Sequence, residues 1–186
     1  MKMQQTRTFI SVELPQSDTI KAMMDSLRDI PNVKVTPSGQ LHITLCFLGD
    51  VDTDRIPTIC SELKRAFKDT ESFHITVKGI GAFPNKRNAR IIWMGIEDDG
   101  ELSGCAYKIT RTLKRMGIRY DGKEFTPHIT IGRARDTVNI TEIADDNEDT
   151  VFLDFECSSI HVMKSTLRPT GAEHSVICII PLIDKM

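Results

Sequence analysis

The positions of hydrophobic and polar residues along this chain predict a series of short strands interrupted by amphipathic helices. Runs rich in β-branched and aromatic residues, bounded by turn-forming residues, predict strands, and apolar residues spaced three and four apart predict helices. Strands are expected at residues 8–14, 33–35, 42–48, 73–80, 90–96, 128–133, 150–157, 159–166 and 174–182. Helices are expected from Ser17 or Asp18 to about Arg28, at residues 54–68 and from Glu101 to Met116 before Gly117, and residues 140–147 are expected to form a short acidic helix or a loop.

The order of these elements repeats. A strand, a helix, a short strand and a longer strand are expected within residues 8–48, and the same succession within residues 90–133. A tetrapeptide in the last strand of each unit recurs after 86 residues, at positions 42 and 128. We interpret this as a degenerate internal duplication, which makes residues 1–186 one α+β domain of two interleaved lobes. A rough two-fold relation between the lobes predicts that equivalent strands lie on opposite walls of a central cleft.

The composition is that of an ordinary globular protein. Its 186 residues are 40% hydrophobic and 27% charged, with a net charge of −2. This balance excludes a global basic surface for long nucleic acids, so any nucleic-acid substrate is expected to be bound locally. Five cysteines without a C-x-x-C pair predict free thiols in a reducing compartment. No signal-like or membrane-spanning apolar segment is evident, and a cytoplasmic location is expected.

The repeated tetrapeptides carry the candidate chemistry. They are His42-Ile43-Thr44-Leu45 and His128-Ile129-Thr130-Ile131. Residues i and i+2 of a strand face the same way, so each copy presents an imidazole and a hydroxyl together on one face. Two imidazoles, one taking a proton and one giving it, suffice to hydrolyse a phosphodiester without a metal.

The same residues are also compatible with roles outside catalysis. Both histidines can be surface residues of strands in which threonine merely favours β structure. Metal binding by the pair is a further alternative, although no Asp or Glu in either motif completes a site. A third copy, His74-Ile75-Thr76-Val77, falls outside the repeated succession, and a structural role is expected for it. The roles of His161 and His174 are left unassigned.

Several segments, taken in order, resemble the two-histidine (2H) phosphoesterase superfamily. The similarity extends from residue 7 to about residue 182, and it is closest to the branch called 2′-5′ RNA ligase-like, or RNA 2′,3′-cyclic phosphodiesterase. The segments that carry it are Arg7-Thr8-Phe9-Ile10 ahead of Leu14-Pro15, Leu41–Leu45 with Phe47-Leu48-Gly49, Gly81–Pro84, Arg90–Trp93 and Phe125–Arg133. The chain departs from the family pattern at residues 33–36, which lack a tryptophan often found there, and at His174, where a tyrosine is common.

The resemblance implies a fold and a set of site residues. The implied fold is a bilobal α+β fold with a pseudo-two-fold axis, two antiparallel sheets facing a central cleft, and helices on the outside. His42 and His128 are implied to be the general acid and base, in an order that the sequence leaves open. Thr44 and Thr130 are implied to bind the non-bridging phosphate oxygens, and Arg133 to contact phosphate or nucleoside. Phe47, like Phe9, is a candidate for the pocket lining or for the core.

The resemblance also implies an activity. The implied enzyme hydrolyses a terminal 2′,3′-cyclic phosphate of RNA to a 2′-phosphomonoester, without metal or other cofactor, and can join RNA ends through a 2′-5′ bond in reverse. Its partner is an RNA end, with tRNA fragments as candidates, and a monomer without membrane or protein partners is expected. Five basic residues suggest a funnel for the RNA strand next to its terminal phosphate: Lys86, Arg87, Arg90, Arg133 and Arg135. Ordinary surface charge is the alternative for Lys86, Arg87 and Arg135.

Two further functions are compatible with the sequence. One is a non-catalytic module that binds RNA ends, and the other is a phosphodiesterase for small cyclic nucleotides or for ADP-ribose cyclic phosphate.

Overall fold

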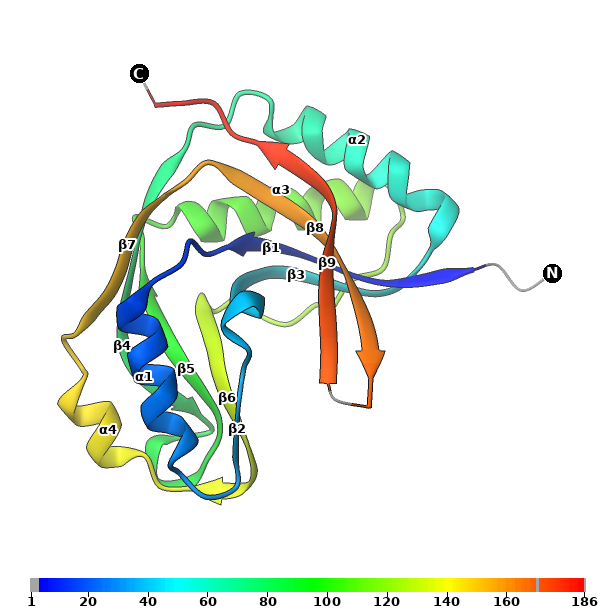
Figure 1. The fold of residues 1–186 in the computed structure, drawn as a ribbon. Coiled ribbons are helices and arrows are strands. Elements are labelled where there is room, and N and C mark those ends of the chain that lie inside the picture. Colours follow the sequence, from blue (N-terminus) through cyan, green and yellow to red (C-terminus); the bar gives the residue numbers. More distant parts are fainter. Residues whose placement is uncertain (1–3, 170, 186) are drawn as a thin grey trace.

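The fold is a curled antiparallel sheet with helices on its outer side (Figure 1). A computed structural model describes residues 4–169 and 171–185. The strands are β1 (Gln5–Glu13), β2 (Val33–Val35), β3 (His42–Asp52), β4 (Phe73–Phe83), β5 (Ala89–Glu97), β6 (His128–Val138), β7 (Val151–Cys157), β8 (Ser159–Arg168) and β9 (Gly171–Pro181). The α-helices are α1 (Asp18–Arg28), α2 (Ile56–Phe67), α3 (Glu101–Arg115) and α4 (Thr141–Asp146). Each strand and helix for which the hydrophobic pattern gave a residue range is present, and residues 140–147 take the helical alternative.

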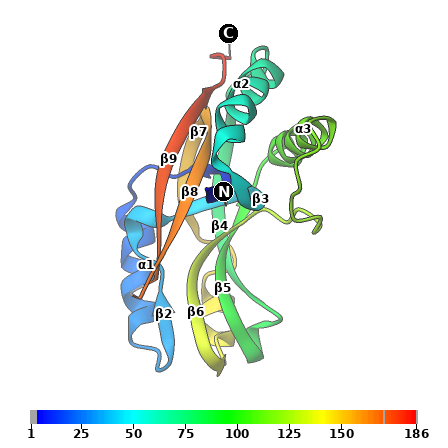
Figure 2. The ribbon, with the colours of Figure 1, turned by 90° about the vertical axis from the view of Figure 1, so that its right-hand side faces the viewer.

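The sheet consists of two halves that meet at one point. Its strand order is β7-β4-β5-β6-β3-β1-β8-β9, with β2 also paired to β6. Strands β3 and β6, which join the halves, share only the pair Ile43 and Ile129, whereas their outer partners run alongside them for many residues. The predicted α+β class with antiparallel strands is confirmed. The two expected sheets are continuous through this single junction, and the sheet curls around it (Figure 2).

The helices link the two halves. Helix α1 comes from the first half of the chain but packs on β2, β6 and β7, while α3 comes from the second half and packs against β3 and α2. Each half therefore covers part of the other. No helix in residues 4–169 and 171–185 has the length and apolarity needed to cross a membrane.

Local sequence signals explain where the helices begin and end. Ser17 caps α1, since its hydroxyl accepts a hydrogen bond from the backbone N–H of Ile20 at 3.2 Å. Helix α3 stops before Gly117, whose φ of +64° is readily adopted by glycine. Both boundaries agree with the prediction.

One predicted correspondence between the halves is wrong. The first half contains the short strand β2, but residues 119–127 of the second half form no strand. Within the described residues, this segment makes one backbone–backbone hydrogen bond outside helices and strands. Asp121 N–H donates it to the carbonyl oxygen of Phe47 on β3, at 2.7 Å. Gly122 and Pro127 explain the difference, because glycine weakens a strand and proline lacks the N–H that pairing needs.

Candidate active site

The two repeated tetrapeptides face each other across the junction of the sheet. Ile43 pairs with Ile129 in an antiparallel register, so His42 is placed opposite Thr130 and Thr44 opposite His128. Both isoleucines are fully buried, and the histidines and threonines therefore point to the other, concave face. Side chains opposite one another in such a pair have Cβ atoms about 4.5–5.5 Å apart, and diagonal neighbours are about 7–8 Å apart. All four side chains line the same cavity on that face.

Both imidazoles are held in the same way. His42 Nδ1 lies 2.8 Å from the carbonyl oxygen of Gln40, and His128 Nδ1 lies 2.7 Å from that of Thr126, in each case two residues earlier. A carbonyl oxygen only accepts, so Nδ1–H is the donor in both rings. Each Nε2 is then the nitrogen left to exchange a proton with a ligand.

These residues line one cavity of about 690 Å³. Six of the seven site residues predicted from the sequence meet there: His42, Thr44, Phe47, His128, Thr130 and Arg133. They come from segments up to 91 residues apart in the chain, between 42 and 133, and the register at the junction brings them together. The structure thus gathers the groups that proton transfer and phosphate binding require in one place.

Arg90, the seventh predicted residue, is not part of this cavity. It is exposed on β5 and lines neither of the two cavities next to His128. The pairing of β5 with β6 breaks register between Ala89 and Ile91, and Arg90 lies at that break. The predicted basic funnel is therefore reduced to Arg133, because Lys86 forms an ion pair with Asp145 at 2.7 Å and Arg87 and Arg135 also lie outside both cavities.

The remaining histidine motifs lie elsewhere. His74 is exposed on β4, where its Nε2 lies 2.8 Å from Asp154 on β7, and Thr76 donates a hydrogen bond to the same carboxylate. His161 on β8 contacts Ser159 and lines neither cavity. The third copy of the motif therefore links β4 to β7 through Asp154 and lies outside both cavities.

Sequence inspection leaves the functions of three cavity residues unassigned. The ring of His174 on β9 meets that of His42 edge-on, with 5.1 Å between centroids, and also contacts Phe9 at 4.8 Å. Arg7 and Lys34 also line the cavity. For Arg7 a signal is available, since it stands two residues before Phe9 and so shares its face of β1. For Lys34 and His174 no local signal exists, because their positions depend on distant strand pairings.

Charge and burial suit this cavity to an anion. Arg7, Lys34 and Arg133 contribute positive charge, and the one acidic residue of the lining, Glu173, is paired with Arg168 at 3.1 Å. Burial is the largest influence on the pKa of His42 and lowers it below its ordinary value of 6.5. The Gln40 carbonyl and Glu13 oppose this shift, and the nearby His128 adds the smallest effect, in the lowering direction. Within the described ranges, no group of three or more His, Cys, Asp or Glu is arranged to hold a metal ion.

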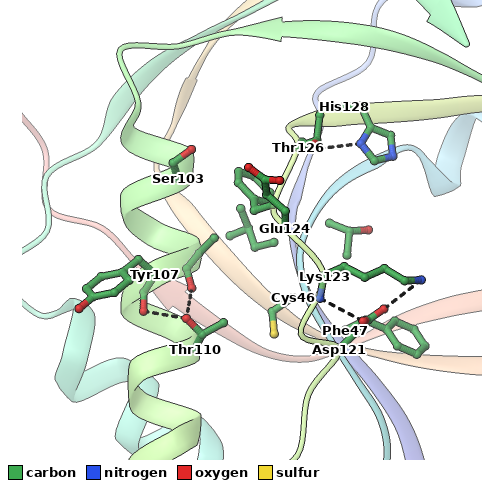
Figure 3. Close-up of a pocket in the computed structure, with 14 residues that line it drawn as sticks. Cys46, Phe47, Ser103, Tyr107, Thr110, Asp121, Lys123, Glu124, Thr126 and His128 are labelled. Atoms are coloured by element: carbon green, nitrogen blue, oxygen red, sulfur yellow. Dashed lines mark hydrogen bonds and ion pairs between the residues drawn. The ribbon is translucent and has the colours of Figure 1, made fainter. Parts of the chain in front are cut away.

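A second cavity, of about 430 Å³, adjoins the first (Figure 3). It shares Thr44, Phe47 and His128 with the large cavity and extends from there between β3, α3 and residues 121–128. The place where the second half lacks its short strand is therefore a hollow that opens beside His128.

A family model, curated proteins and solved structures all give matches to this chain that cover most of its length. Residues 15–168 match the family model described as the 2′-5′ RNA ligase superfamily. The chain is 32% identical over 168 residues to the RNA 2′,3′-cyclic phosphodiesterase of Archaeoglobus fulgidus, an alignment that covers 89% of this chain and 94% of that one. Among solved structures, a crystal structure of a protein from Thermus thermophilus superposes with a TM-score of 0.82 at 24% identity, covering 97% of this chain and 100% of the other. Escherichia coli LigT in complex with 3′-AMP superposes with a TM-score of 0.78 at 18% identity, covering 96% and 99%.

Proposed function

The chain belongs to the 2′-5′ RNA ligase superfamily, and on this basis we propose that it is a metal-independent RNA 2′,3′-cyclic phosphodiesterase that leaves a 2′-phosphomonoester. The observation that carries the proposal is the register of Ile43 with Ile129, which sets two imidazoles and two threonine hydroxyls around one cavity. The activity of relatives that align along most of the chain supports the same conclusion.

The two histidines take different roles in the proposed reaction. Two neighbouring imidazoles are not both protonated at low cost, so one starts the reaction neutral and the other protonated. His42, whose pKa burial lowers, is then the general base, and His128 is the general acid. His42 Nε2 takes a proton from water as the water oxygen bonds to phosphorus. The bond from phosphorus to the ribose 3′-oxygen breaks, and that oxygen receives the proton of His128 Nε2.

Charge that builds up on the phosphoryl oxygens is stabilised by fixed donors. The hydroxyls of Thr44 and Thr130 lie on either side of the phosphate position, and the Arg133 guanidinium lines the same cavity. Donors held in place before the reaction stabilise the transition state without reorganisation. These groups supply the stabilisation that a cation would give, so the proposed enzyme works without one.

The test is incubation of an oligonucleotide ending in a 2′,3′-cyclic phosphate with the protein in EDTA, followed by identification of the terminal phosphate. We expect complete conversion to the 2′-phosphate. A 3′-phosphate product would contradict the proposed leaving group, and loss of activity that added metal restores would contradict metal independence. Parallel assays with nucleoside 2′,3′-cyclic phosphates separate RNA ends from small cyclic nucleotides as the preferred substrate. Adding a 5′-hydroxyl oligonucleotide tests the reverse reaction, the formation of a 2′-5′ bond.

The proposed setting follows from the same features. We place the enzyme in the cytoplasm, in keeping with five cysteines that are all free thiols, and we expect it to act as a monomer. RNA fragments that carry a cyclic phosphate end, such as those of tRNA, are the expected substrates. We also propose that residues 1–186 form a single domain.

A further inference from the structure

We propose that a cavity beside Trp93 binds the base of the nucleotide that precedes the reacting one, so that the site takes the end of an RNA chain in preference to a mononucleotide. The proposal rests on the proposed function and deepens it, since it adds a second unit of the substrate. It concerns a third cavity, of about 390 Å³, whose lining shares no residue with the two cavities next to His128.

The third cavity lies on the sheet face that carries the catalytic groups. Strands β4, β5 and β6 lie side by side (Figure 1). Trp93 on β5 is the register partner of Thr130 on β6 and of Gly81 on β4. Directly paired residues point to the same face of a sheet, so the face of His128 and Thr130 continues to Trp93. An RNA chain that leaves the histidines along this face reaches Trp93.

An aromatic ring separates Trp93 from the catalytic imidazole. The ring of Phe83 meets that of His128 edge-on, with 5.3 Å between centroids, and contacts the ring of Trp93 at 5.4 Å. The base of the reacting nucleotide is attached to the sugar carbon next to the one that carries the 2′-oxygen, so it stays close to the cyclic phosphate. The place beyond Phe83 therefore suits the next base along the chain.

The Trp93 ring is placed as a stacking surface. A β-carbon at Gly81 would lie 2.2 Å from two ring carbons of Trp93, so only glycine lets the ring lie over β4. Trp93 is half-buried and lines the cavity. Within residues 4–169 and 171–185 its buried Nε1–H has no hydrogen-bond partner, a cost in stability that a phenylalanine in its place would avoid. Packing alone does not account for this tryptophan, whereas a large exposed ring on a sheet is a common support for unstacked bases.

The charges around the third cavity favour a neutral group over a phosphate. Lys78 forms ion pairs with two carboxylates, at 3.1 and 3.4 Å, and Lys86 forms one at 2.7 Å. Both lysines are thus already neutralised by acidic neighbours. The cavity also contains the carboxylate of Glu148. A base, which is uncharged, enters these surroundings more easily than the phosphate that follows it.

Two polar groups are available to the edge of a base. Asn85 Oδ1 accepts hydrogen bonds from the backbone N–H groups of Arg87 and Asn88, at 3.1 and 3.0 Å, which leaves the side-chain NH₂ as a donor. Glu148 makes no side-chain hydrogen bond or ion pair in the part of the chain that the structure describes, so its carboxylate remains as an acceptor. Bases carry both donors and acceptors on their edges.

The kinetic test compares two dinucleotides that end in a 2′,3′-cyclic phosphate. One is complete and the other lacks the 5′ base, so both carry the same charges and the ratio of their kcat/KM values reports the base alone. We expect the wild type to favour the complete dinucleotide about tenfold, the order of magnitude of stacking one base. Trp93→Leu should abolish this preference, and Trp93→Phe, which keeps an aromatic ring, should retain part of it.

The matched control is His74→Leu. This change also removes a ring from the same sheet face, on β4, at a position outside all three cavities. It should alter neither the preference nor the activity. Equal kcat/KM of the two dinucleotides with the wild type, or a preference that Trp93→Leu leaves intact, overturns the proposal.

A fluorescence measurement keeps this proposal separate from the proposed function. Trp93 is the only tryptophan of the sequence, so the emission of the unmodified protein reports on the third cavity without turnover. A dinucleotide ending in a 2′-phosphate should quench this emission, whereas the same ligand without its 5′ base and a nucleoside 2′-phosphate should not. That result supports the subsite even if no hydrolysis is seen, in which case only the proposed function fails. Unchanged emission with the dinucleotide, or equal quenching by all three ligands, overturns the subsite.

Discussion

The two halves of the sheet are alike at the catalytic motifs and different beside them. In each half the histidine donates to a carbonyl two residues earlier, and in each the threonine follows at i+2. Beside the second motif, β2 pairs with β6 so that Lys34 is the partner of Arg133. The position equivalent to Arg133, 86 residues earlier, is Phe47, where Asp121 makes a single backbone bond. The shared part serves the reaction, and the divergent part gives the two sides of the site different surfaces.

The two histidines also have different surroundings. His42 is packed against the rings of Phe9 and His174, with centroid distances of 5.0 and 5.1 Å. His128 meets the ring of Phe83 edge-on at 5.3 Å and borders the open second cavity. Nearly identical motifs therefore give two imidazoles with different ring neighbours, which suits separate acid and base roles.

The largest expected effect tests this division of roles. His42→Ala and His128→Ala should each lower kcat by about 10²–10⁴-fold, since each removes one proton-transfer group. A p-nitrophenyl phosphodiester needs no proton on its leaving group, so it should restore more activity to His128→Ala than to His42→Ala. Equal behaviour of the two variants with this substrate would contradict the assignment of acid and base. Retained binding of a 2′-phosphorylated product would show that both variants are folded.

Replacing either threonine should have the same effect, unlike replacing either histidine. Thr44→Val and Thr130→Val keep the shape of the side chain but remove the hydroxyl, and each should lower kcat by about 10²-fold, the usual effect of losing one oxyanion donor. Steady-state kinetics of both variants, with Thr→Ser replacements as controls that keep the hydroxyl, measures this. A rise in KM with unchanged kcat would mean that the hydroxyls bind the ground state and the transition state equally.

Comparing variants of Arg133 and Arg135 distinguishes a contact inside the cavity from ordinary surface charge. Arg133→Met should raise KM about tenfold, because a charged hydrogen bond to phosphate is lost. Arg135→Met, two residues further along β6 and outside the cavity, should leave KM unchanged. Equal effects of the two changes would indicate a general attraction of RNA by the surface.

The smallest effect concerns the pH dependence of kcat/KM. His42 acts as a base only when neutral, and burial lowers its pKa, so the acidic limb of a bell-shaped profile should lie below pH 6.5. His174→Ala should admit water, reduce the cost of charging His42 and move this limb to higher pH. His174→Phe keeps His42 buried and should leave the limb in place. A shift of equal size in both variants would point to the charge of His174 and not to burial.

The parts of this site that could be predicted are those written in short segments of sequence. The i, i+2 spacing of His and Thr sets their common face, and the cap at Ser17 and the stop at Gly117 follow from single residues. Arg90 lies outside both cavities next to His128, at a register break that cannot be seen in one strand. His174 and Lys34 reach the cavity through pairings between distant strands. The missing short strand, by contrast, follows from local sequence, because Gly122 weakens a strand and Pro127 lacks the N–H that pairing needs.

The pair Ile43 and Ile129 also bears on how such a site can arise. Each half of the chain supplies one imidazole and one hydroxyl, which is half of what the chemistry needs. Two copies of a single half, associated about the same axis, would already contain the full set. In one continuous chain the two flanks are encoded separately, so one can carry Arg133 and the other Phe47 without any change to the shared histidines and threonines.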